Sequence, residues 1–130
     1  MISTKKESLS TLVHKLDKLV SEVVKRAAAS YDGKCECISC DIRLPWQEMD
    51  CAHFIDRGNM NTRFNLMNLA PACKDCNRFN EDTHKAKWAE KLGAYNVEHL
   101  EREGRSMRKL MRFELEKGID LMEQKLKQLR

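Results

Sequence analysis

Aromatic residues are scarce in this sequence, and long apolar runs are missing from it. Phe, Trp and Tyr make up 6% of the 130 residues, so a core must be built mostly from Leu, Val, Met and Ala. No apolar run approaches the roughly 18–20 residues that a membrane-spanning helix needs. The opening residues, MISTKKESLSTLVHKL, carry charges where a signal peptide needs its apolar stretch. We therefore expect a cytosolic protein with no membrane partner.

The sequence also has no low-complexity tract, and no internal repeat beyond two Cys-x-x-Cys pairs. A length of 130 residues suits one domain, 1–130. The formal net charge of +4 is mildly basic, which permits an anionic partner such as nucleic acid without requiring one. Six cysteines in a cytosolic chain indicate metal binding rather than disulfides.

Residues 4–30 have the apolar spacing of an amphipathic helix with a narrow seam. Thr4 and Glu7 have the spacing of a capping box, which predicts that the helix begins there. We expect it to end near Gly33, which can take a left-handed conformation. The seam residues, spaced by three or four, are Leu9, Val13, Leu16, Val20, Val23 and Ala27.

The central segment, 34–83, holds all six cysteines and both prolines and shows little helical period. Its LPWQEMDCAHF stretch is consistent with two short strands around a turn. We expect NLMNLAPAC to be a loop, because Pro71 disfavours helical backbone at Ala70. After Cys76 the chain is expected to enter a helix.

The last segment, 84–130, is predicted to be helical. Short helices should end at Gly93 and Gly104, and Ser106 should cap a long segment that reaches Arg130. Gly118 weakens that segment by about 1 kcal/mol relative to Ala. We favour packing of the two long helices on each other or on the central segment over a dimer seam, because intramolecular packing is the commoner use of such stripes. The second stripe is Met111, Leu115, Ile119, Met122, Leu126 and Leu129.

The two Cys-x-x-Cys pairs predict a structural zinc site. Two residues between thiolates let both sulfurs of a pair reach one ion, and two pairs complete a closed tetrahedral site. A set of metal-free buried thiols is the alternative. The leftover Cys35 and Cys51 are expected to act as small buried apolar residues. The four predicted ligands are Cys37, Cys40, Cys73 and Cys76.

His53 is the candidate catalytic residue, because it lies between the two cysteine pairs beside a polar, Gly-containing loop. A neutral imidazole can accept a proton at physiological pH, although a lone histidine is more often structural. If 50–53 is a strand, Asp50 and His53 point to opposite faces, so that sharing a site would need a bulge or turn. The remaining histidines, His14, His84 and His99, lie in charged helical segments and are expected at the surface.

Further polar residues surround His53 in the sequence. Asn68 and Asn77 offer amide oxygens that can orient an imidazole or bind a hard cation. Four basic residues could hold phosphates or simply form a solvated surface: Arg57, Arg63, Lys74 and Arg78.

Taken together, CISC, DCAHF and RG…TRFN…NLAPACKDCN resemble the phage NinG/Rap recombination nuclease family, a branch of the HNH or ββα-metal nucleases. The resemblance covers roughly residues 35–100, and the terminal helices carry little of it. It implies an α+β fold: a zinc-stabilised, treble-clef-like ββα-metal core flanked by long N- and C-terminal helices.

The resemblance also implies roles for individual residues. His53 matches the general base that activates water, and Asn68 matches the Asn that tethers the base-bearing strand to the loop. Asn77 matches the last motif position, which helps hold a divalent metal, Mg²⁺ or Mn²⁺. Many HNH enzymes have an acidic residue or a second His immediately before the base. Here that neighbour is Ala52, and Asp50 is the nearest substitute ligand.

The function implied is a metal-dependent endonuclease that cuts branched recombination intermediates such as Holliday junctions in a bacterial host cell, encoded by a phage or prophage. A homodimer through the long helices would suit cutting two strands. A zinc-stabilised DNA-binding module without chemistry and a protein-interaction adaptor are the alternatives. The first predicts that His53 is dispensable, and the second predicts little DNA affinity and weak salt dependence.

Overall fold

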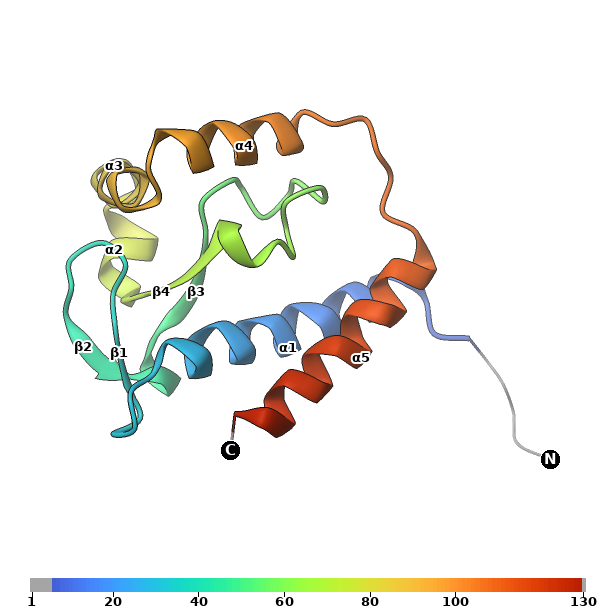
Figure 1. Cartoon of the computed structure of the whole chain (residues 1–130), viewed down its shortest axis with the longest axis horizontal. Helices are drawn as coiled ribbons and strands as arrows, with labels where there is room; N and C mark the ends of the chain where they lie inside the picture. Colours follow the sequence, from blue (N-terminus) through green and yellow to red (C-terminus); the bar gives the residue numbers. More distant parts are fainter. Residues whose placement is uncertain (1–5, 130) are drawn as a thin grey trace.

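A computed structural model describes residues 6–129, except for the side chain of Glu81. Within this range the chain is a mixed α+β protein with five α-helices and two small antiparallel sheets (Figure 1). The helices are α1 (Leu9–Ala28), α2 (Lys74–Phe79), α3 (Glu81–Leu92), α4 (Ala94–Gly104) and α5 (Arg112–Gln128). The strands are β1 (Lys34–Glu36), β2 (Arg43–Pro45), β3 (Asp50–His53) and β4 (Leu69–Ala72), with short 3-10 turns at Trp46–Glu48 and Leu66–Asn68.

The β3–β4 hairpin is the middle layer of the molecule, with α1 and α5 on one side and α2, α3 and α4 on the other (Figure 1). Side chains alternate between its two faces. Cys51 and Leu69 join the apolar cluster of α1 and α5. Ala52 and Ala70, which are cross-strand partners, join the cluster that contains Trp88. The hairpin therefore separates two small cores.

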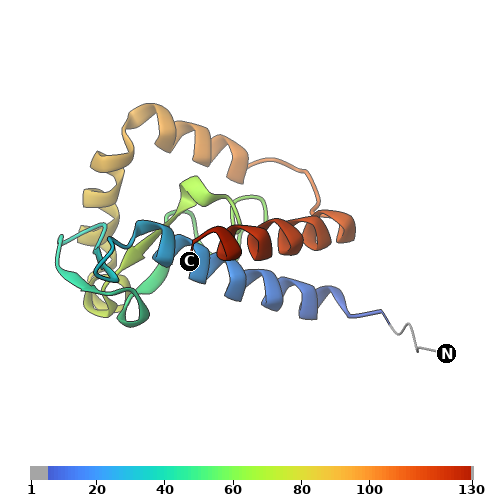
Figure 2. The same ribbon diagram turned by 60° about the horizontal axis from the view of Figure 1, so that its bottom comes forward.

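The long helices α1 and α5 pack on each other, as the sequence led us to expect (Figure 2). Three of the six predicted seam residues of α1 are buried together with Leu12, which the predicted seam did not include, and α5 buries two residues of its own stripe against them. The expected packing of the two long helices on each other is therefore confirmed. The buried residues are Leu12, Leu16, Val20, Val23, Leu115 and Met122.

Both long helices begin later than predicted. The α1 helix starts at Leu9, because the Ser8 hydroxyl caps it by accepting a hydrogen bond from the Thr11 N–H at 3.1 Å. The predicted cap residue Thr4 lies outside the described residues. The α5 helix starts at Arg112, where the Glu114 carboxylate accepts the Met111 N–H at 3.1 Å. The prediction that Ser106 caps this helix is therefore wrong, and residues 105–111 form a link.

The NLMNLAPAC stretch is not a loop, because it contains β4. Cys51 and Pro71 are cross-strand partners, while the neighbouring Phe54 N–H donates to Asn68 O at 2.8 Å. Cross-strand pairs of an antiparallel sheet alternate between hydrogen-bonded and non-hydrogen-bonded. Cys51 and Pro71 form a non-hydrogen-bonded pair, so the missing N–H of Pro71 costs no hydrogen bond to β3. Its carbonyl accepts the Ile38 N–H at 2.9 Å, which fastens the first Cys-x-x-Cys turn to β4.

Candidate metal centre and active-site pocket

The four cysteines of the two Cys-x-x-Cys pairs form one cluster. Cys37 and Cys40 lie after β1, whereas Cys73 is the N-cap of α2 and Cys76 lies within that helix. Their sulfur atoms all lie within 4.8 Å of one another. Four thiols at this spacing suit a soft, tetrahedral ion, so the cluster could hold a metal such as zinc.

The surroundings of these thiols favour ionisation of Cys37 and oppose ionisation of Cys76. Burial opposes ionisation of Cys37, but the N–H groups of Cys40, Cys73 and Ser39 outweigh it and lower the pKa of the thiol to about 7. Burial, together with the neighbouring thiols, raises the pKa of Cys76 to about 12. Binding of an ion that requires thiolates would therefore release protons.

The leftover cysteines stay outside the cluster, as expected. Cys35 is fully buried, and burial raises the pKa of its thiol. Cys51 is half-buried and faces α1, where burial raises its thiol pKa to about 11. Both are poor thiolates, which suits the expected apolar role.

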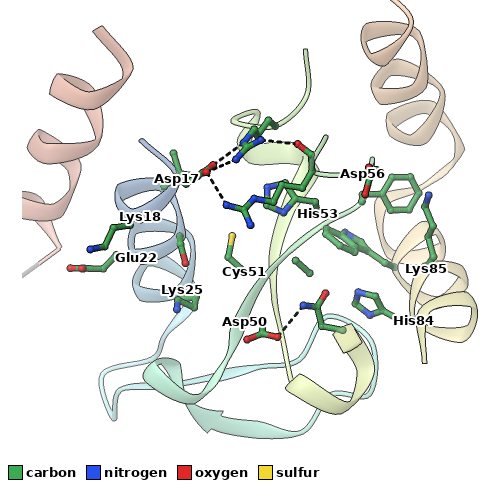
Figure 3. A pocket seen from close by; sticks show the side chains of 18 of the residues that line it. Asp17, Lys18, Glu22, Lys25, Asp50, Cys51, His53, Asp56, His84 and Lys85 are labelled. Atoms are coloured by element: carbon green, nitrogen blue, oxygen red, sulfur yellow. Dashed lines mark hydrogen bonds and ion pairs between the residues drawn. The ribbon is translucent and has the colours of Figure 1, made fainter. Parts of the chain in front are cut away.

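A pocket of about 720 Å³ lies between α1 and α3 (Figure 3). Five consecutive residues, 50–54, line it, so it follows the edge of β3 opposite β4. The wall on the α1 side includes Asp17, Lys18, Glu22 and Lys25. The other wall includes Asn77, His84, Lys85 and Trp88, and the loop after β3 adds Asp56, Arg57 and Arg63.

Asp50 and His53 reach this pocket from opposite faces of a regular strand. The sequence led us to expect that a bulge or turn would be needed to bring them into one site. No bulge is needed for both residues to line the pocket, because a pocket along a strand edge is accessible to side chains from both faces. Figure 3 shows Asp50 beside α2 and His53 toward the α1 side.

His53 is half-buried, and its surroundings favour the neutral imidazole. Burial lowers its pKa below the ordinary value of 6.5, and the positive charges of Arg57 and Arg63 act in the same direction. The Asp17 carboxylate and the Arg63 backbone act in the opposite direction. A neutral imidazole beside an open pocket can accept a proton from water.

Asp50 is held by two residues of α2. Its carboxylate accepts the Asn77 amide at 3.0 Å and the Arg78 guanidinium at 2.9 and 3.0 Å. Burial raises its pKa, but the bonds from Arg78 and Asn77 outweigh burial, and the net result is a lowered pKa. Asp50 and Asn77 carry the carboxylate and amide oxygens that a hard cation prefers, and in this arrangement the Asn77 amide nitrogen faces Asp50.

Asn68 is fully buried and ties the loop after β3 to the hairpin. Its side-chain oxygen accepts the Ile55 N–H at 2.7 Å, and its amide donates to Ile55 O at 3.2 Å and Thr62 O at 3.1 Å. Bonds of this kind are what the tethering role implied by the resemblance requires. Asn68 acts on the pocket through the backbone and does not line it.

The four basic residues predicted to bind phosphate lie in different surroundings. Arg57 and Arg63 line the pocket and are ion-paired with Asp17. Arg78 is bound to Asp50, and the exposed Lys74 is not a lining residue.

Among the pocket residues that were not predicted from the sequence are His84 and Asp17. His84, expected at the surface, is 5% exposed and lies 5.5 Å from the Trp88 ring. The spacing of His84, Trp88 and Leu92 along α3 was a usable signal, because residues four apart share a helix face. Asp17 gave no such signal, since a lone carboxylate between seam residues resembles any solvated helix position. The predicted exposure of His14 and His99 is confirmed.

The family model described as "Bacteriophage Lambda NinG protein" matches residues 3–130. The match includes both long helices, which the sequence motifs had left outside the resemblance. No curated protein and no solved structure gives a significant match. None of the helices in residues 6–129 has the length and apolar character needed to cross a membrane.

Proposed function

Because the chain belongs to the bacteriophage lambda NinG protein family, we propose that it is a metal-dependent endonuclease of the HNH type that cuts branched DNA, such as recombination junctions. One observation carries the proposal. A half-buried histidine with a lowered pKa shares a pocket with a carboxylate–amide pair, beside a helix whose first turn belongs to a four-cysteine cluster. A helix so fixed would hold Asn77 in place.

In the proposed reaction, His53 takes a proton from a water molecule in the pocket. The water oxygen forms a bond to the scissile phosphorus while the bond from phosphorus to the 3′-oxygen breaks. Arg57 faces the pocket with a side chain that is 58% exposed, and its guanidinium suits a nonbridging phosphate oxygen. His53 therefore needs to be neutral, which its lowered pKa favours.

Asp50 and Asn77 would hold a divalent ion, Mg²⁺ or Mn²⁺. Such an ion, when bound, supplies Lewis-acid stabilisation of the phosphate and the leaving oxygen. The carboxylate and amide oxygens suit a hard cation. To bind one, Asn77 would turn its amide, whose nitrogen now contacts Asp50, and Arg78 would release at least one Asp50 oxygen. The proposed zinc at the four cysteines is structural, because four thiolates complete its coordination.

Two observations favour a DNA-binding module without chemistry. Ala52, fully buried, offers no ligand atom at the position next to the base, and Asp50 is already paired with Arg78. In that case the pocket would bind DNA phosphate and the four-cysteine cluster would only support the fold.

The test is cleavage of a labelled four-way junction, a flap and a linear duplex with Mg²⁺, Mn²⁺ or EDTA. We expect cutting that needs the metal and falls by about 10²–10⁴-fold in His53→Gln. His99→Gln is the matched control, because that histidine is exposed on α4 and outside the pocket lining. Tight junction binding with no cutting in any metal would replace the nuclease with the binding module.

A further inference from the structure

We propose that Asp17, on the N-terminal helix, is a positioning residue of the active site, where its carboxylate fixes Arg63 as a support and aims Arg57 at the phosphate beside His53. This inference rests on the proposed nuclease function and adds a residue that the HNH-like sequence motifs do not include. Figure 3 shows Asp17 reaching from α1 into the pocket on the side of His53.

The Asp17 carboxylate accepts hydrogen bonds from two guanidinium groups. Arg63 donates from Nε to Oδ1 of Asp17 at 3.0 Å and from Nη2 to Oδ2 at 2.5 Å. Arg57 donates from Nη2 to Oδ2 at 3.0 Å. Burial raises the pKa of Asp17, but the arginine bonds outweigh burial and lower it, so the carboxylate is charged at neutral pH.

The two arginines are not equivalent. Arg63 is 14% exposed, and its third nitrogen, Nη1, donates to Arg57 O at 3.3 Å. Because its donors are directed into the protein, Arg63 joins α1 to the loop and has a supporting role. We therefore assign the predicted phosphate contact to Arg57 instead of Arg63. The side chain of Arg57 is 58% exposed and uses one bond to Asp17, which leaves most of its guanidinium accessible to a phosphate.

Asp17 also offsets the charge of the two arginines. Without it, two adjacent guanidinium groups would repel each other, and Arg57 would lose the bond that sets its direction. The electrostatic effect reaches His53 as well, because Asp17 raises the imidazole pKa while Arg57 and Arg63 lower it. The geometry thus assigns α1 a direct part in the site, in addition to covering the hairpin.

The experiment compares wild type with Asp17→Asn, which keeps the shape of the side chain and removes its charge. Asp120→Asn is the matched control, because it removes the same charge from an exposed position on α5. Junction binding is measured with Ca²⁺ in place of the active metal, and cleavage is measured under single-turnover conditions. We expect Asp17→Asn to lower the cleavage rate by about tenfold or more, with affinity changed by no more than about threefold.

A second readout does not depend on cutting. The His53 imidazole is titrated by NMR in the DNA-free protein, with His53→Gln used for assignment. We expect its pKa to fall in Asp17→Asn, to rise in Arg57→Gln and to stay unchanged in Asp120→Asn. The opposite signs separate loss of a specific neighbour from general loosening of the fold. Should Asp17→Asn fail to fold, Arg57→Gln still tests the assignment, since this exposed side chain can be shortened without loss of packing.

Two results would overturn the proposal. Faster cleavage together with tighter binding in Asp17→Asn would show that the carboxylate blocks the arginines instead of aiming them. An unchanged His53 pKa in both Asp17→Asn and Arg57→Gln would show that the cluster does not act on the imidazole. If the wild-type protein cuts no DNA, the nuclease proposal fails by itself, and the titration alone decides whether Asp17 sets the environment of His53.

Discussion

Asn68 shows how one buried amide can hold a site that it does not line. It is 0% exposed and makes three hydrogen bonds to the backbone of Ile55 and Thr62. These bonds fix the start and the far side of the loop that carries Arg57 and Arg63. The position of the loop relative to His53 therefore depends on a side chain in the 3-10 turn that directly precedes β4.

We expect Asn68→Ala to lower the free energy of unfolding by about 3 kcal/mol, because it leaves an N–H and two carbonyl groups without their partner. Urea unfolding followed by circular dichroism measures the change. Asn96→Ala is the control. It loses one part-buried hydrogen bond from α4 to Leu92 O at the end of α3 and should cost no more than about 1 kcal/mol. Equal losses in the two variants would contradict the tether assigned to Asn68.

At the residue scale, the sequence was a better guide to which candidate residues lie together than to the surroundings of single residues. Residue type and spacing brought out His53, Asp50 and Asn77, and all three line one pocket. His84 was misplaced because its charged neighbours outweighed the signal from Trp88. Asp17 was missed because its partners lie 40 and 46 positions away along the chain, and no local pattern records contacts at that range.

At the element scale, periodic segments were predictable and the irregular segment was only partly so. The helices ending at Gly93 and Gly104 follow from their sequence, and Gly93 takes the positive φ of +85° that favours glycine. β4 was not predicted because Pro71 and two alanines have low propensity for strands. What makes it a strand is pairing with β3 and burial of all four of its residues, both of which are tertiary.

Gly118 lies at a close contact between two helices, whereas the sequence alone indicates only a loss of helix propensity at this position. A Cβ built at Gly118 would lie 3.1 Å from Leu16 Cδ2, so α5 approaches α1 closely at this point. The missing side chain lowers helix propensity by about 1 kcal/mol relative to Ala. The close approach of the two helices explains why a glycine stands here despite its lower helix propensity.

We expect Gly118→Ala to change stability little in the wild-type chain, because the gain in helix propensity is offset by the contact with Leu16. In a Leu16→Ala background, which itself costs about 2–5 kcal/mol, Gly118→Ala should stabilise by about 1 kcal/mol. A double-mutant cycle in urea measures this coupling. A stabilisation of the same size in both backgrounds would contradict the close packing of α5 on α1 at this position.

At the scale of the whole molecule, two small cores share one hairpin. One core joins α1 and α5 to Leu69, and the other joins the cysteine cluster to Trp88 and Leu100. The facing apolar stripes of the long helices are occupied within the chain. A homodimer, which we proposed as suited to cutting two strands, would therefore have to use another surface, such as the outer side of α5, where Phe113 and Leu121 are exposed.

The two cores should respond differently to loss of metal. The four-cysteine cluster joins the β1–β2 segment to the start of α2, so chelation should loosen residues 35–40 and 73–92. The α1–α5 pair is held by apolar contacts and should keep most of its protection. Hydrogen exchange with and without a zinc chelator measures both regions in one experiment. Metal analysis should find about one ion per chain before chelation.

Cysteine variants separate this effect from general damage by the chelator. Cys40→Ser should abolish metal binding at little packing cost, because Cys40 is exposed, and should reproduce the loosened pattern. Cys51→Ser should retain the ion, because Cys51 lies on the opposite face of the hairpin and outside the cluster. Uniform exchange over α1, α3 and α5 after chelation would mean that the molecule unfolds as one cooperative unit. The pocket, which takes one wall from each side of the hairpin, would then depend on the metal for both walls and not only for the wall formed by α2 and α3.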